Sequence, residues 1–235
     1  MKHLKKFESF ENEDFEIKYF GKLTEIEENW LIRTGRKSYS GGELRPIFLN
    51  GKMIGGISWN LGGIDYIQFL PEYKGKGYLK YIVKNNIDDG KVKFVSASPE
   101  LTNMLKKYGV VTYNENNDIT TVHISITLYH GTCKANADHL ISNGWKPTGQ
   151  SGANMGQGRY LYLSSEPEDA LWFAQEKGCD SVVEVKDIPI EYLRPDPEDE
   201  AGFTMNDLLE RIDKHGFPAK FALWKELGKE HFKLK

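Results

Sequence analysis

Two glycines alternate with two lysines between a predicted strand and a predicted helix in the N-terminal half. The strand is expected over residues 64–69, and the helix begins near Leu79. The connecting residues are Lys74, Gly75, Lys76 and Gly77. Free backbone N–H groups at the start of a helix, with glycines that let a ligand approach, suit a pyrophosphate. The alternative is a plain turn that joins a strand to a helix.

A second set of chemically capable side chains lies within residues 128–197. A predicted strand ends in His130, Gly131 and Thr132, and Tyr162 belongs to a later strand. A run of acids then follows, made up of Asp196, Glu198, Asp199 and Glu200. Taken singly, each has an ordinary interpretation: a structural histidine, a tyrosine packed on the core like Tyr160, and a solvated acidic loop.

Other site chemistries find no support in the sequence. We see no serine, cysteine and histidine triad, and His139 on a predicted helix is expected to be exposed or packed. Cys133 and Cys179 lack metal-ligand spacing and cannot build a disulfide framework. One bridge between them is conceivable, but two separate thiols are the more common case and indicate a reducing cytoplasm.

Composition excludes several broad classes. The 235 residues carry 31 basic and 34 acidic side chains, a net charge of −3, which argues against a protein that coats nucleic acid. An apolar share of 39% is ordinary for a globular chain. No apolar run approaches the roughly 20 residues that span a bilayer, so we expect no membrane span.

The length predicts one to two domains, and the element pattern divides near residue 126. Residues 1–14 read as a leader without a secretory signal, and residues 15–126 as a mixed sheet flanked by helices. A hairpin is expected about Asn50 and Gly51, and a helix over 98–108 capped by Ser98.

Residues 127–235 form the second predicted domain, of α+β type. We expect a helix closed by Asn143 and Gly144, a glycine-rich loop over 149–158 that could act as a lid, and a strand over 159–165. The next elements are a helix over 167–174 with Trp172 in the core, a strand over 181–185, a turn-rich segment over 188–197 and a helix over 206–214.

The N-terminal half resembles the acyl-CoA-binding core of the GNAT N-acetyltransferases. Lys74, Gly77 and Leu79 occupy the positions where that family carries Arg or Gln, Gly, and Gly or Ala. The leucine at the last position departs from the family pattern and narrows the space for a pyrophosphate. The position of the tyrosine that often serves as general acid in the family holds Leu105, which has no proton to give. The resemblance implies a GNAT-like fold and acetyl-CoA as a candidate cofactor. The leader also resembles the N-terminal segments of many tailed-bacteriophage proteins, which implies a protein of the host cytoplasm or the virion.

The C-terminal half resembles the ADP-ribosyltransferase superfamily, in its His–Tyr–acid branch and closest to the rifampicin-modifying type. The resemblance rests on three pieces in register: the His-Gly-Thr strand end, an Ala-x-Trp-x-Ala helix after the Tyr162 strand, and Asp196-Pro197 beyond the next strand. It implies a split sheet around a cleft for NAD, and transfer of ADP-ribose to a protein, a nucleic acid or a small molecule.

The same resemblance implies a role for each residue. His130 would bond a ribose hydroxyl, and Gly131, beside Thr132, would offer its backbone to the carboxamide. Tyr162 would stack on the nicotinamide ring, and Asp196 would stabilise positive charge developing on the ribose, as in glycoside cleavage. Glu198, Asp199 and Glu200 are alternatives for the acid.

Three other functions stay open. One is an acetyltransferase that uses the Lys74–Gly77 loop, with the second domain as a nucleotide-binding or partner-recognition module. Another is a non-enzymatic pair of adaptor and nucleotide-binding domains. The third is the RNA 2′-phosphotransferase branch, which shares the fold but adds an arginine and histidine set that we do not find.

Overall fold

The computed structural model describes residues 15–17, 45–60, 63–147 and 159–235. Helices and multi-stranded sheets are mixed, as the sequence predicts at this coarse level. Contacts divide the chain into a first unit, Met1–Asn86 with Lys93–Ala97, and a second unit, Ile87–Val92 with Ser98–Lys235. The predicted boundary near residue 126 falls inside the second unit. Among the described helices, none has the length and apolar character needed to cross a membrane.

The first unit is built on a sheet in which β1 to β5 are neighbours in chain order. Its strands are β1 (Phe15–Ile17), β2 (Arg45–Leu49), β3 (Lys52–Asn60), β4 (Gly63–Phe69) and β5 (Lys91–Val95), the last of which belongs to this unit from Lys93 onward. The pairs β1–β2, β2–β3 and β3–β4 are antiparallel, and β5 pairs with β4 in parallel. Asn50 and Gly51 both have positive φ, 50° and 73°, so the predicted hairpin is confirmed with a turn that suits the strand twist.

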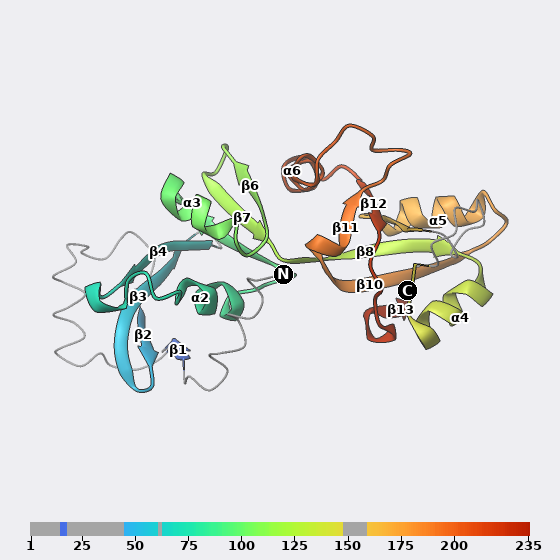
Figure 1. Ribbon diagram of the computed structural model, residues 1–235. Helices are drawn as coiled ribbons and strands as arrows, with labels where there is room; N and C mark the ends of the chain where they lie inside the picture. The colour runs from blue at the N-terminus through green and yellow to red at the C-terminus, as the bar shows by residue number, and fades with distance from the viewer. Residues whose placement is uncertain (1–14, 18–44, 61–62, 148–158) are drawn as a thin grey trace. The chain divides into compact units, whose positions relative to one another are not determined.

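A short helix follows the lysine and glycine turn of the first unit. The 3-10 helix η3 (Pro71–Tyr73) precedes the turn, and α2 (Leu79–Asn85) follows it. Leu79, Ile82 and Val83 are buried, as their spacing predicts, and α2 lies against the sheet (Figure 1).

The second unit holds a six-stranded sheet in the order β11-β12-β9-β8-β10-β13. Its strands are β8 (Ser125–Thr132), β9 (Leu161–Ser164), β10 (Ser181–Pro189), β11 (Leu193–Pro195), β12 (Lys220–Leu223) and β13 (Phe232–Leu234). All neighbouring pairs are antiparallel. The strand predicted over 181–185 runs on to Pro189, and β12 was not predicted.

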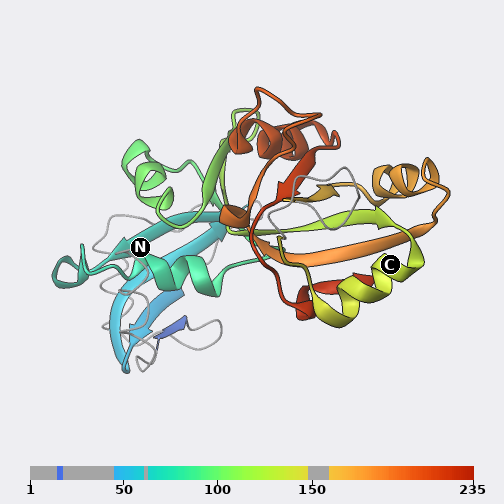
Figure 2. The same ribbon diagram turned by 45° about the vertical axis from the view of Figure 1, so that its right-hand side comes forward.

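Helices lie on both sides of this sheet. The elements are α4 (Lys134–Asn143), α5 (Pro167–Gln175), α6 (Met205–His215) and the 3-10 helices η4 (Ile190–Tyr192) and η5 (Lys229–His231). Figures 1 and 2 show α5 along one side of β8 and α4 on the opposite side. Gly144 ends α4 with φ 75°, as predicted, and α6 begins with a capping box between Thr204 and Asp207.

Small residues on α5 decide where Trp172 points. Ala170 and Ala174, four residues apart, are buried on the side of α5 that faces β8. Trp172, two residues from each, therefore points away from that side, and it is 53% exposed. The expectation that Trp172 belongs to the core is wrong, because the close approach of helix and sheet leaves room only for alanine.

Residues before the predicted boundary pack into the second unit. Helix α3 (Pro99–Leu105) is capped by Ser98, as predicted, and the hairpin of β6 (Val110–Asn114) and β7 (Ile119–His123) follows it. This hairpin packs against α6 through a polar network. Asp213 Oδ2 lies 2.9 Å from His123 Nε2 and accepts a hydrogen bond of 3.1 Å from the Thr112 hydroxyl. Lys91 Nζ lies 3.5 Å from Asp213 Oδ1.

This network holds Asp213 ionised. Burial alone would raise the pKa of Asp213, but the hydrogen bonds and charges of His123, the charge of Lys91 and the Thr112 hydroxyl together lower it. A carboxyl group with a lowered pKa contributes stability that is fully present above its ordinary pKa. That contribution is lost as the pH falls through the folded-state value.

Asp213→Asn is expected to lower the free energy of unfolding at pH 7 by about 1–3 kcal/mol, because it removes a half-buried charge from three partners. Urea unfolding as a function of pH measures this loss. The difference from the natural chain should shrink as the pH falls below the ordinary pKa of 3.8 and vanish only below the lowered folded-state pKa of Asp213, where both side chains are neutral. The matched control is Asp138→Asn, whose carboxylate is 58% exposed, and a loss as large in the control would contradict the prediction.

Candidate active site

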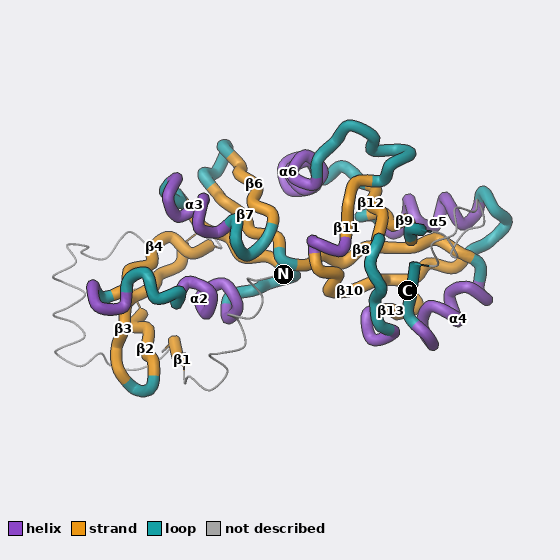
Figure 3. The backbone as a smooth tube through the Cα atoms, in the orientation of Figure 1, coloured by secondary structure: helices purple, strands orange, loops and turns teal. Residues whose placement is uncertain are grey.

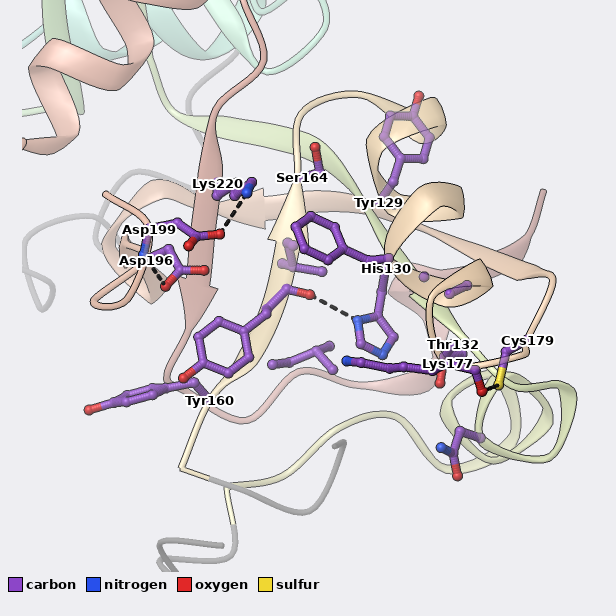
Figure 4. Close-up of a pocket in the computed structure, with 18 of the residues that line it drawn as sticks. Tyr129, His130, Thr132, Tyr160, Ser164, Lys177, Cys179, Asp196, Asp199 and Lys220 are labelled. Carbon is purple, nitrogen blue, oxygen red and sulfur yellow. Dashed lines mark hydrogen bonds and ion pairs between the residues drawn. The ribbon is translucent and has the colours of Figure 1, made fainter. Parts of the chain in front are cut away.

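One cavity in the second unit collects most of the residues that the sequence singled out. Its volume is about 410 Å³, within the range of small-molecule sites. The ends of β8, β9 and β12, the inner side of α5 and the loop after β11 form its walls (Figure 4). Figure 3 shows that this loop, which joins β11 to α6, has no regular structure.

His130, Tyr162 and Asp196 all line this cavity, although they lie far apart in the sequence. Gly131 and Thr132 line it beside His130. Glu198 and Asp199 also face it, whereas Glu200 is not among the lining residues. The histidine, the tyrosine and the first acid of the predicted set therefore meet at one place.

The cavity opens where β8 and β9 separate. Tyr129 pairs with Ser164, and continued pairing would set Gly131 opposite Tyr162. Instead, His130 Nδ1 lies 2.8 Å from the Tyr162 carbonyl oxygen, so a side chain bridges the gap. The Tyr162 carbonyl points toward β8, into the gap between the two strands. In an antiparallel pair, two residues directly opposite each other point their backbone groups either both toward or both away from the partner strand. The N–H and C=O of Gly131, which would lie opposite Tyr162, therefore also face this gap.

Gly131 is also the point at which α5 touches β8. A Cβ atom built on Gly131 would lie 1.6 Å from the Ala170 carbonyl oxygen and 3.2 Å from the Ala174 nitrogen. Any larger residue would push α5 away from the strand. The sequence resemblance implies backbone contact with a ligand, and the structure adds helix packing as an independent reason for glycine.

The bond to Tyr162 sets the tautomer of His130. A carbonyl oxygen only accepts, so His130 Nδ1 carries the hydrogen. Burial, with a smaller effect of the Lys177 charge, lowers the pKa of His130 despite this hydrogen bond. The ring is therefore neutral at pH 7, and its Nε2 is an acceptor that could receive a hydrogen bond from a hydroxyl group.

Tyr162 presents its ring to the cavity and its hydroxyl to an acid. The Tyr162 side chain alternates with buried Leu161 and Leu163, and its hydroxyl donates to Glu198 Oε1 at 3.2 Å. Burial, followed by the nearby charges of Glu198 and Asp196, raises the pKa of Tyr162 to about 12. The phenol therefore stays protonated, and Glu198 helps to orient its ring.

The structure separates the four candidate acids. Asp196 is buried, and its Oδ1 accepts the backbone N–H groups of Glu198 at 2.8 Å and Asp199 at 3.3 Å. Burial raises the pKa of Asp196 in spite of these bonds. Asp199 pairs with Lys220 at 2.6 Å, while Glu200 accepts from Arg211 and from the Lys220 backbone. Glu200 is thus a structural residue that holds the loop to α6 and β12.

The sequence analysis missed several lining residues, among them one aromatic and two basic side chains. Phe173 and Lys177 come from α5 and the turn after it, and Lys220 comes from the unpredicted β12. Lys220 Nζ lies 4.5 Å from the centre of the Phe173 ring. The helical spacing of Ala170, Phe173, Ala174 and Lys177 was the available signal for the first two, and we find none for Lys220.

The two cysteines are bonded to each other, so the expectation of separate thiols is wrong. Cys133 stands at the N-cap of α4, and Cys179 follows α5. The fold places these helix ends next to each other at the cavity wall, although 46 residues separate the cysteines. The predicted cytoplasmic location loses the support it drew from free thiols.

The other predicted ligand-binding residues belong to the first unit. Lys74, Gly75, Lys76 and Gly77 form an exposed turn, with φ of 74° at Gly75 and 85° at Gly77. Lys76 Nζ lies 5.5 Å from the Tyr73 ring centre. The predicted lid over 149–158 and the leader over 1–14 lie outside the described residues.

The cavity has the donors and acceptors of an organic-ligand site. It offers a neutral imidazole, aromatic rings, peptide groups at a strand gap and carboxylates. Within the described ranges, no group of three or more His, Cys, Asp or Glu side chains could hold a metal ion. No protein-family model matches the sequence, and no curated protein matches it significantly.

We expect nuclear magnetic resonance to find His130 with a proton on Nδ1 and none on Nε2 at pH 7. Its protonation midpoint should lie below the ordinary 6.5, because burial and Lys177 disfavour the charged ring. Nitrogen-15 shifts measured from pH 4 to 8 test both points, and His130→Gln assigns the signal by its loss. A proton on Nε2, or a midpoint above 6.5, would contradict this account.

Replacing both cysteines by serine is expected to lower the free energy of unfolding by about 2–4 kcal/mol, because the crosslink closes a long loop in the unfolded chain. Urea unfolding under oxidising conditions measures the difference. A thiol reductant should bring the natural chain to the midpoint of the double variant and leave the variant unchanged. Equal midpoints without reductant would show that the bond is absent.

Proposed function

We propose that the second unit is an NAD-dependent mono-ADP-ribosyltransferase of the His–Tyr–acid type. The observation that carries the proposal is that His130, Tyr162 and Asp196 line one cavity. They follow one another along the sequence in the order that the resemblance implies. The acceptor is a protein, a nucleic acid or a small molecule. A GNAT-like fold for the first unit belongs to the same proposal.

The residues fit the nicotinamide riboside part of NAD. The acceptor at His130 Nε2 suits a ribose hydroxyl, and the Gly131 peptide groups in the strand gap suit a carboxamide, which needs both a donor and an acceptor. The Tyr162 ring offers a flat surface for stacking, held from its far end by Glu198.

The proposed reaction breaks the bond between the ribose carbon and the nicotinamide nitrogen. Nicotinamide leaves with the bonding electron pair, the acceptor's nucleophile bonds to the same carbon, and its proton passes to a base. Positive charge develops on the ribose along this path, as in glycoside cleavage. The buried carboxylate of Asp196 is already in place to stabilise that charge without reorganisation.

Acetyl transfer from acetyl-CoA remains the alternative proposal, and it rests on the Lys74–Gly77 turn alone. That turn precedes a helix of only seven residues. The position of the tyrosine that often serves as general acid in the GNAT family holds the buried Leu105. No observation in the described residues favours it over ADP-ribosyl transfer. A location in the host cytoplasm or in the virion is proposed on the resemblance of the leader alone.

Incubation with NAD labelled in its adenylate phosphate is expected to transfer label to a component of a bacterial lysate, or to release labelled ADP-ribose to water. His130→Ala should abolish both, because it removes the acceptor for the ribose and the bridge to Tyr162. His139→Ala is the matched control, since His139 is exposed on α4 and outside the cavity.

Equal labelling by the natural chain and the His130→Ala variant would overturn the proposal, provided that their unfolding midpoints show both to be folded. Calorimetric titration with NAD and with acetyl-CoA separates the two candidate reactions. Tight binding of acetyl-CoA without any heat from NAD would favour the alternative.

A further inference from the structure

Two arginines flank one tyrosine at the edge of the cavity. Tyr160 lines the cavity, and its ring lies 6.3 Å from that of Tyr162 in an edge-to-face arrangement. The Arg194 guanidinium carbon lies 3.7 Å from the centre of the Tyr160 ring, and that of Arg159 lies 5.7 Å from it. Arg194 comes from the edge strand β11, and Arg159 directly precedes Tyr160.

Neither arginine has an acidic partner among the described residues, whereas the cavity residue Lys220 does have one. Lys220 is paired with Asp199 at 2.6 Å, but no ion pair joins Arg159 or Arg194 to a described carboxylate. The Nε of Arg194 is buried without a hydrogen-bond partner. Burial and the like charge of Arg159 both lower the pKa of Arg194, so the pair is electrostatically unfavourable as it stands.

The repulsion between the Arg159 and Arg194 charges, next to the cavity, would be relieved by a bound anion. The Arg194 guanidinium lies over the Tyr160 ring, with its central carbon 3.7 Å from the ring centre, and a guanidinium carries its N–H groups in a planar, rigid fork. Phosphate is the anion that best matches such a fork, since two of its oxygens accept parallel hydrogen bonds. A phosphate would also relieve the repulsion between the two guanidinium groups.

We propose that Arg159 and Arg194, arranged around Tyr160, form a phosphate-binding subsite at this end of the cavity. Two sources of phosphate fit: the diphosphate of a dinucleotide held by His130 and Tyr162, or a phosphate carried by the acceptor. Of the three residues only Tyr160 lines the cavity, so the subsite adjoins the cavity of the proposed function, and it does not require ADP-ribosyl transfer.

The test measures the binding of inorganic pyrophosphate, NAD, nicotinamide mononucleotide and nicotinamide riboside to the full chain by calorimetry. The variants are Arg159→Gln and Arg194→Gln, and each should weaken pyrophosphate binding about tenfold or more, because each removes a charge-assisted hydrogen bond. Lys233→Gln is the matched control: Lys233 is exposed on β13, at the opposite edge of the sheet from β11.

The four probes identify the source. If NAD and the mononucleotide weaken along with pyrophosphate while the riboside does not, the subsite holds the dinucleotide's own phosphate. If only pyrophosphate weakens, the subsite holds a phosphate of the second ligand. Both results support the subsite.

The inference is overturned if the Gln variants bind pyrophosphate as the natural chain does, or if no phosphate-bearing probe binds the natural chain. Arg159→Gln keeps the test valid if Arg194→Gln fails to fold, because Arg159 is exposed and its contact with the Tyr160 ring is a distant one. Arginine-dependent binding of pyrophosphate without any binding of NAD would preserve the subsite and remove only the proposed function.

Discussion

The hydrogen bond between His130 and the Tyr162 carbonyl is the interaction on which the cavity depends. Strands β8 and β9 pair at Tyr129 and Ser164 and then part, which would leave the Tyr162 carbonyl without a strand partner. His130 supplies the missing donor, so the strands can stay apart without an unsatisfied backbone group. The same bond leaves Nε2 of the ring as an acceptor. One contact therefore opens the gap and prepares a side chain within it.

The close approach of α5 to β8 supplies the second constraint. Gly131 removes the Cβ atom that would meet the Ala170 carbonyl, and the small residues of α5 let the helix lie directly on the strand. This contact brings Phe173 and Lys177 to the cavity wall and turns Trp172 outward. The bond between Cys133 and Cys179 ties the end of the same helix to the start of α4. The wall is thus fixed at both ends of α5.

Local signals in the sequence predicted the elements well, and the resemblance predicted which distant residues would meet. The turn at Asn50, the cap at Ser98 and the glycine stop at Gly144 were confirmed, because each depends on a few adjacent residues. Strand β12 was missed, since its four residues are defined by pairing with β9 and β11. The Cys133 pairing and the exposure of Trp172 were also missed, because both follow from the contact of helix and sheet.

The acids after β11 show why composition could not identify the functional carboxylate. All four lie within five residues, yet Glu200 is held by Arg211 and the charge of Asp199 is balanced by Lys220. A balanced charge does little for a cation that develops nearby, which leaves Asp196 and Glu198. Glu198 is exposed and serves the Tyr162 hydroxyl, whereas Asp196 is buried, where an electrostatic interaction is screened less by water. On the proposed function, Asp196 is therefore the carboxylate with the strongest effect on the ribose.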